Sequence, residues 1–129
     1  MKLLLDTHIW IWYLLGNERL SQTLRTEIAN ESNELWLSPI SIWETLILAE
    51  KGKLILTPDP QTWIQNSLQQ LDTEEAPLSH EITILSRQLQ LKQQDPADRF
   101  IAATAIHLEL TLATVDQQFT QLNWLNTLS

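Results

Sequence analysis

The chain has 129 residues, of which 43% are hydrophobic and 19% are charged, a composition that excludes an intrinsically disordered protein. It contains no cysteine, which excludes a disulfide framework, a thiolate metal site and a cysteine nucleophile. Its 16 Asp and Glu outnumber 8 Lys and Arg, and the net charge of −8 argues against broad electrostatic binding of nucleic acid. A nucleic-acid enzyme of this composition therefore needs local compensation from a metal ion, a basic partner or a basic patch.

Neither a secretion signal nor a membrane span is expected. The apolar start, Met1–Leu5, is cut short by Asp6 and lacks the longer apolar region of a signal peptide. No run of about 18 apolar residues, the length that a spanning helix needs, is present. These features, with the absence of cysteine, fit a protein of the reducing cytoplasm.

The first half of the chain alternates short apolar runs with longer helical patterns. Leu3-Leu4-Leu5 is the continuous apolar run of a buried parallel strand, and Gly16 and Gly52 stand where helices end. Asp59-Pro60 is a cap residue followed by a first-turn proline. The expected elements are a strand at Lys2–Asp6, helices at Thr7–Leu15 and from Ser21 to about Glu31, a strand at Leu35–Ser38, and helices at Pro39–Lys51 and from Asp59 to about Leu71.

The second half continues the alternation, and Asp95-Pro96 repeats the cap-plus-proline signal. We expect a strand at Ala76–Leu78, a helix from Ser79 to about Leu89, a helix from Asp95 to about Glu109, a strand at Leu110–Val115, a short helix or turn at Asp116–Gln121 and a last strand at Asn123–Leu125. Strands that alternate with helices indicate parallel pairing. The expected fold is therefore an α/β/α sandwich around a short parallel sheet, with its site beyond the carboxyl ends of the strands.

Four acidic residues are candidates for a functional site. Asp6 and Asp116 follow strands, although each could simply cap the next helix. Asp98 could support a helix start in the same way. Glu44 is harder to explain by a structural role alone, because its helical neighbours Ile40, Ile47 and Leu48 form an apolar stripe that is expected to face a core. Asp98 shares such a stripe with Ile101, Ala102 and Ala105.

One explanation accounts for all four carboxylates. A carboxylate that faces a core is costly unless it is paired or binds metal, and few basic residues lie nearby. A hard cation such as Mg²⁺ or Mn²⁺ accepts oxygen ligands and relieves the repulsion between them. We therefore expect Asp6, Glu44, Asp98 and Asp116 to hold a divalent cation.

The chain resembles the PIN-domain nucleases, and in order and spacing the VapC-type toxins of bacterial toxin–antitoxin pairs. The blocks that carry the resemblance are Leu4-Leu5-Asp6-Thr7-His8, Ser38-Pro39-Ile40-Ser41-Ile42-Trp43-Glu44, Glu50-Lys51-Gly52-Lys53-Leu54, Asp95-Pro96-Ala97-Asp98-Arg99-Phe100-Ile101-Ala102-Ala103-Thr104-Ala105, and Leu112-Ala113-Thr114-Val115-Asp116 with Phe119. They span nearly the whole chain, so we expect a single domain over residues 1–129.

The resemblance implies a PIN-like three-layer fold and an Mg²⁺- or Mn²⁺-dependent endoribonuclease that hydrolyses RNA with a metal-activated water. It also implies a cognate antitoxin and a homodimer. The catalytic and metal-binding acids would be Asp6, Glu44, Asp98 and Asp116, with Asp95 as a helix cap and at most a secondary ligand. Further contacts to phosphate or to the acids could come from Thr7, Ser41, Arg99 and Thr114. Taken singly, each of the three hydroxyls is more simply an ordinary helix cap, and Arg99 could equally form a surface ion pair.

Six tryptophans are many for this length. Trp10 and Trp12 cannot share one helix face, so the helix over Thr7–Leu15 is apolar nearly all round. It is either a core helix or one whose outer side meets a second copy or an antitoxin. Trp36, Trp43 and Trp63 are more simply core residues.

Two other functions are weighed against the nuclease. An aspartate-based phosphotransferase also places an acid after its first strand, but His8 stands where one such class needs a second acid, and no Lys follows Asp116 as the other class requires. A non-catalytic metal-binding module would use the same acids only to stabilise the fold. The sequence does not identify the RNA, the number of metal ions or the antitoxin.

Overall fold

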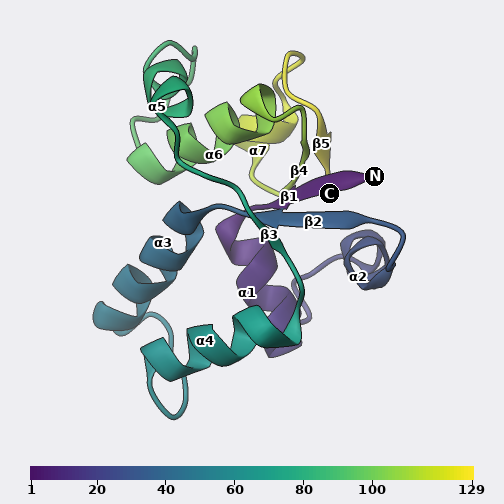
Figure 1. Ribbon diagram of the computed structural model, residues 1–129, viewed down its shortest axis with the longest axis vertical. Helices are drawn as coiled ribbons and strands as arrows, with labels where there is room; N and C mark the ends of the chain where they lie inside the picture. Colours follow the sequence, from purple (N-terminus) through teal and green to yellow (C-terminus); the bar gives the residue numbers. More distant parts are fainter.

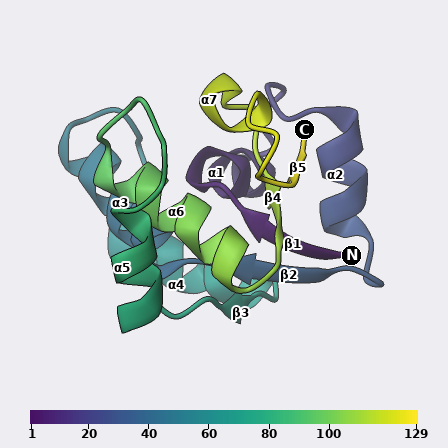
Figure 2. The same ribbon diagram turned by 90° about the horizontal axis from the view of Figure 1, so that it is seen from above.

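The computed structural model describes residues 1–129 and has a five-stranded parallel sheet between two layers of helices (Figures 1 and 2). The strand order is β3-β2-β1-β4-β5, and every neighbouring pair is parallel. The expected three-layer α/β/α sandwich is thus confirmed. In chain order the elements are β1 (Lys2–Leu5), α1 (Thr7–Leu15), α2 (Gln22–Ala29), β2 (Glu34–Leu37), α3 (Pro39–Glu50), α4 (Pro60–Gln70), β3 (Glu74–Glu75), α5 (His80–Ser86), α6 (Pro96–His107), β4 (Thr111–Ala113), α7 (Gln117–Thr120) and β5 (Thr127–Leu128).

Strand β1 divides the apolar interior into two cores, because successive side chains of a strand point to opposite faces. Leu3 and Leu5 belong to the core beneath α1, α2 and α4, whereas Leu4 belongs to the core beneath α6 and α7. Figure 1 shows these two helix groups on opposite sides of the sheet. The buried run of three leucines therefore lies in the sheet that forms the middle layer of the sandwich, as its composition predicted.

Most helix starts follow the predicted capping residues. The predicted caps Ser21, Asp59, Ser79 and Asp95 each accept a hydrogen bond from the first turn of the helix that follows. Ser38, which was predicted as the end of a strand, caps α3 in the same way. Helix α1 ends at Gly16, whose φ of 64° is a left-handed conformation that glycine adopts without strain. Most helices therefore begin and end within about two residues of the predicted positions, whereas α5 ends at Ser86 and was predicted to continue to about Leu89.

Two predicted strands were wrong, and both belong at the edges of the sheet. The third strand is at Glu74–Glu75 instead of Ala76–Leu78, and Ala76 is a core residue just beyond it. The last strand is Thr127–Leu128 instead of Asn123–Leu125, because Leu125 packs into the second core. In both cases the apolar signal came from a residue that fills the core beside a short edge strand.

The tryptophans are distributed differently from the prediction. Trp10 is buried and meets Trp63 edge-on, with ring centroids 5.6 Å apart. Trp36 and Trp63 are half-buried and pack against the cores. The expectation that Trp43 is a core residue was wrong, since it is 51% exposed on α3. Of the two tryptophans in α1, Trp10 thus belongs to the core and Trp12 is half-buried.

The topology brings distant carboxylates to one edge of the sheet. Strands β1 and β4 are neighbours at the centre, and the strand order reverses between them. Asp6 directly follows β1, and Asp116 comes three residues after β4. Crevices at such switch points are where open α/β sheets bind ligands. No helix of the structure is long and apolar enough to cross a bilayer.

Candidate active site

All four predicted carboxylates line a single open cavity of about 410 Å³ at the carboxyl edge of the sheet. Asp6 comes from the end of β1, Glu44 from α3, Asp98 from the first turn of α6, and Asp116 from the start of α7. The exposed helix cap Asp95 also lines the cavity. Residues that are far apart in the chain thus form one acidic site.

Asp6 both caps a helix and faces the cavity. Its Oδ1 accepts a hydrogen bond from the Thr7 backbone N–H at 2.8 Å, which is the N-cap interaction of α1. Its Oδ2 accepts a hydrogen bond from the Thr114 hydroxyl at 2.6 Å, which ties β1 to the segment after β4. The capping role and the site role considered from the sequence therefore belong to the same side chain.

Glu44 is oriented by two buried hydroxyl groups. The Thr7 hydroxyl donates a hydrogen bond to the Glu44 carboxylate, and the Thr7 and Ser41 hydroxyls are hydrogen-bonded to each other at 2.9 Å. Both hydroxyl residues are almost completely buried. Of the predicted additional residues, Thr7 and Thr114 thus contact the acids directly, and Ser41 acts through Thr7.

Gln118 links the other two acids and was missed in the sequence. Its Nε2 donates to Asp98 Oδ2 at 2.9 Å and to Asp116 Oδ2 at 3.0 Å. Its backbone N–H also donates to Asp116 Oδ1 at 3.0 Å, so Asp116 caps α7. A glutamine two residues after an acid carries no signal of such a bridge, because the contact to α6 depends on tertiary structure.

The electrostatic environment makes three of these acids hard to ionise. Burial, reinforced by the charges of Asp95, Asp6 and Glu44, raises the pKa of Asp98 to about 7. Burial also raises the pKa of Asp6 and of Glu44, although the hydrogen bonds from Thr114 and Thr7 partly oppose this rise. Groups with raised pKa values in a cleft are typical of functional sites.

The chemistry of the donor set fits a hard divalent cation. Hydrogen bonds to the four carboxylates come from backbone N–H, threonine hydroxyl and glutamine amide groups, and none comes from Lys or Arg. Arg19 lines the cavity but forms no ion pair with the acids. As oriented here, no three His, Asp or Glu side chains surround one point, so a cation held by one or two of the carboxylates would complete its coordination with water. Oxygen-only ligands are those that Mg²⁺ and Mn²⁺ prefer.

Both roles considered for Arg99, a phosphate contact and a surface ion pair, were wrong. Arg99 is only 5% exposed and does not line the cavity. Its guanidinium donates hydrogen bonds to three backbone carbonyls, those of Ser86, Leu89 and Leu91, at 3.0 to 3.2 Å. Arg99 therefore fixes the segment between α5 and α6.

Three other residues that line the cavity were not singled out as site residues from the sequence. His8 and Trp12 lie one turn apart on α1, and Arg19 follows that helix. The cavity reaches the outer side of α1, whose exposure the sequence left open between a core and a partner. Here Trp12 packs partly against the first core and partly lines the acidic cavity.

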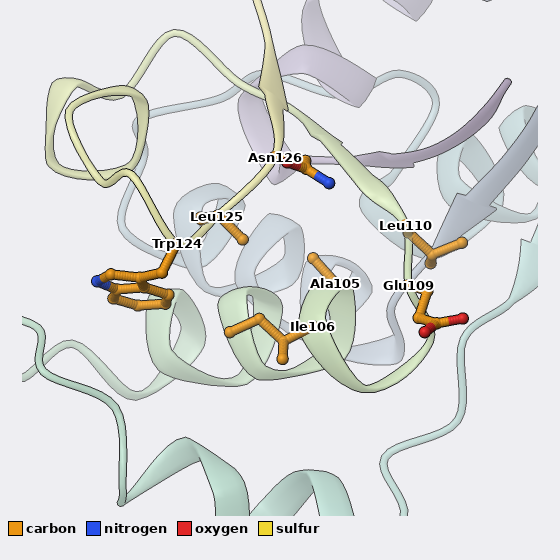
Figure 3. Close-up of a pocket in the computed structure, with 7 residues that line it drawn as sticks. All are labelled: Ala105, Ile106, Glu109, Leu110, Trp124, Leu125 and Asn126. Atoms are coloured by element: carbon orange, nitrogen blue, oxygen red, sulfur yellow. The ribbon is translucent and has the colours of Figure 1, made fainter.

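A second cavity has none of this chemistry. It encloses about 270 Å³ between the carboxyl end of α6 and the segment before β5 (Figure 3). Five of its seven lining residues are hydrophobic, and Glu109 is its only ionisable side chain. The acidic cavity is thus the better candidate for an active site.

Comparison with known proteins gives one family and one fold. The family described as PIN domain matches residues 3–125. Ribonuclease VapC22 of Mycobacterium tuberculosis is 31% identical over 115 residues, which cover 89% of this chain and 87% of that protein.

The structural comparisons support the same fold at lower identity. A chain in the crystal structure of VapBC2 from Rickettsia felis, bound to a promoter DNA fragment, is 20% identical with a TM-score of 0.70, and the match covers 99% of this chain and 98% of that one. A chain in DNA-bound VapBC from Salmonella typhimurium is 20% identical with a TM-score of 0.72, covering 99% and 97%. At these identities the matches show the fold alone.

Proposed function

The chain belongs to the PIN domain family, and from this membership we propose that it is a metal-dependent endoribonuclease, the toxin of a toxin–antitoxin pair. The proposal includes one domain over residues 1–129. The observation that carries it is the convergence of Asp6, Glu44, Asp98 and Asp116 on one cavity without a hydrogen bond from Lys or Arg. The relative VapC22, whose name is that of a ribonuclease, supports the choice of substrate.

In this proposal the four carboxylates hold Mg²⁺ or Mn²⁺. Such a cation supplies Lewis acidity toward a phosphodiester and lowers the pKa of water, so that water becomes a nucleophile at neutral pH. The residues present suit this role because they offer only oxygen ligands and two of them already carry supporting hydrogen bonds from buried hydroxyls. Asp95 is close enough to raise the pKa of Asp98 and serves as a peripheral acid.

The chain's own residues supply orientation and a proton acceptor. Asp6 is fixed by Thr114 and by the start of α1, so it forms the rigid part of the site. Burial raises the pKa of Asp98 to about 7 in the cation-free chain, and a bound cation would lower it, so that the ionised carboxylate could accept a proton from water at neutral pH. Glu44, held by Thr7, is the second candidate for that role.

The proposed partners follow from the structural relatives. Among the structural relatives, one is named as a member of the VapBC family of toxin–antitoxin systems, one as a toxin–antitoxin complex and one as DNA-bound VapBC, so we propose a cognate antitoxin for this chain. The excess of acid around the cavity favours an antitoxin that inserts an Arg or Lys there. We also propose that the toxin is a homodimer.

An RNA cleavage assay tests the proposal. The purified chain should cut RNA with Mg²⁺ or Mn²⁺ and lose activity in EDTA, and Asp98→Asn should abolish cleavage while the fold is retained. Asp72→Asn, which removes an exposed acid that does not line the cavity, is the matched control and should cleave normally. Thermal stabilisation by Mg²⁺ without any RNA cleavage would instead identify a metal-binding module, and normal cleavage by Asp98→Asn would refute the assigned site.

A further inference from the structure

Three side chains of the acidic cavity have no role in the proposed chemistry. His8 and Trp12 come from α1, and Arg19 comes from the turn that follows it. We call these three residues the rim. They line the same cavity as the acids that would hold the cation.

Arg19 is the only Lys or Arg that lines this cavity. It is exposed, and its backbone N–H donates to the Asn17 side chain at 2.9 Å, which fixes the turn that carries it. Its guanidinium forms no hydrogen bond or ion pair within the chain, although five carboxylates line the same cavity. A cationic group in this position is available to an anion that enters from outside.

Trp12 offers an aromatic surface in the same cavity. The ring is half-buried and packs partly against the first core, so its position is constrained. His8, one turn earlier, is exposed, and its ring centroid lies 6.0 Å from that of Trp12 at an interplanar angle of 57°. Proteins that bind single-stranded nucleic acid combine such aromatic platforms with cationic groups that bind the backbone.

The negative charge of the chain indicates why RNA binding would depend on the residues of the rim. With a net charge of −8 and five acids around the cavity, the protein repels a polyanion except where a cation is bound. A bound divalent cation offsets that repulsion only at the phosphate that is cut. The nucleotide beside it needs a separate source of attraction.

Resting on the proposed ribonuclease activity, we infer that the rim binds an unpaired nucleotide next to the cut bond of a single-stranded RNA segment. Arg19 binds the phosphate of that nucleotide, and its base stacks on Trp12. His8 supports the Trp12 ring from the neighbouring turn.

RNA binding without cleavage tests the inference. The affinity of the wild-type chain for a fluorescein-labelled single-stranded RNA is measured by fluorescence anisotropy over a series of KCl concentrations, with Ca²⁺ in place of Mg²⁺ so that an oxygen-bound cation is present without cleavage. A plot of log affinity against log salt concentration should be less steep for Arg19→Gln, with the magnitude of its negative slope reduced by about 0.7, the value for one phosphate contact to a single strand. Trp12→Ala should weaken binding by about tenfold at every salt concentration without changing the slope.

Matched variants separate these effects from general loss of charge or aromatic surface. Arg87→Gln removes an exposed arginine that does not line the cavity, and Trp124→Ala removes a tryptophan that is 41% exposed elsewhere. Both should bind RNA like the parent chain. Trp12→Phe should restore most of the affinity lost in Trp12→Ala. In cleavage assays with Mg²⁺, Arg19→Gln and Trp12→Ala should raise KM and leave kcat nearly unchanged.

The failure of this inference is distinguishable from failure of the proposed function. If the wild-type chain cleaves RNA but Arg19→Gln and Trp12→Ala match their controls, the rim does not bind substrate. If Arg19→Gln changes Mn²⁺ affinity and leaves the salt dependence of RNA binding unaltered, Arg19 is only a counter-charge to the acids. A wild-type chain that neither binds nor cleaves RNA would overturn both proposals.

Discussion

Replacing Asp98 with Asn should stabilise the protein when no divalent cation is present and destabilise it relative to wild type when Mg²⁺ is added. The pKa of Asp98 is raised from 3.8 to about 7, so the folded state keeps a proton that the unfolded state has lost. Stability therefore falls as the pH rises from about 4 to about 7 and is constant above that range.

The magnitude follows from the same shift. About three pKa units correspond to about 4 kcal/mol at full effect, and because Asp98 is only half-buried, screening by solvent reduces this to about 1–2 kcal/mol. Asn retains an oxygen that can accept the Gln118 hydrogen bond, so the variant loses little else. At pH 8 in EDTA the variant should melt about 4–8 °C above wild type, and the difference should shrink toward pH 4.

Differential scanning fluorimetry across pH, with EDTA or with Mg²⁺, measures this directly. Added Mg²⁺ should raise the Tm of the wild type and should have little effect on Asp98→Asn, because a ligand that binds the folded state stabilises it in proportion to its affinity. Asp72→Asn shows the effect of losing one carboxylate from an acidic chain without touching the cavity. A variant less stable than wild type at pH 8 in EDTA would refute the idea that Asp98 is held at an electrostatic cost.

Three more predictions concern the same site and its surroundings. Gln118→Leu removes the amide that links Asp98 to Asp116, so isothermal titration should show Mn²⁺ binding weakened by about 10–100-fold. The control Gln117→Leu, on the exposed side of α7, should bind Mn²⁺ normally. Equal affinities of the two variants would show that the amide does not position the acids. A cation must displace the proton of the Asp98 carboxyl, whose pKa is about 7. The affinity for Mg²⁺ should therefore fall about tenfold for each pH unit below 7 and be constant above pH 7. An affinity that does not change with pH would contradict the raised pKa. Arg99→Met leaves three backbone carbonyls of the α5–α6 segment without their hydrogen-bond donor. Urea unfolding should show a free energy of unfolding lower by about 3 kcal/mol, while the affinity for Mn²⁺ should be unchanged. Weaker Mn²⁺ binding without a loss of stability would instead indicate that Arg99 acts in the active site.

The sequence predicted the central layer and the main helices because their signals are local. The apolar run Leu3-Leu4-Leu5 indicates a strand buried on both faces, and the cap-plus-proline pairs at Asp59 and Asp95 mark helix starts wherever they occur. The two edge strands depend on pairing with a neighbour instead of on their own composition. Polar Glu74–Glu75 is a strand only because β2 lies beside it.

The acids of the site were predictable because a carboxylate on an apolar stripe conflicts with its surroundings. Glu44 and Asp98 showed that conflict in the sequence, and the structure places both in the acidic cavity. The opposite held for Arg99, whose charge suggested a surface role although it is buried among backbone carbonyls. Gln118 and Arg19 gave no signal, since only the folded chain brings them to the cavity.

Anomalous diffraction from crystals of the protein soaked in Mn²⁺ is the most direct measurement of where the cation binds. The expected result is an anomalous peak inside the acidic cavity, within bonding distance of carboxylate oxygens of Asp6 and Asp98, that disappears in Asp98→Asn. An empty cavity at saturating Mn²⁺, or a peak elsewhere with the Arg19 guanidinium turned in among the acids, would contradict a cation-dependent nuclease.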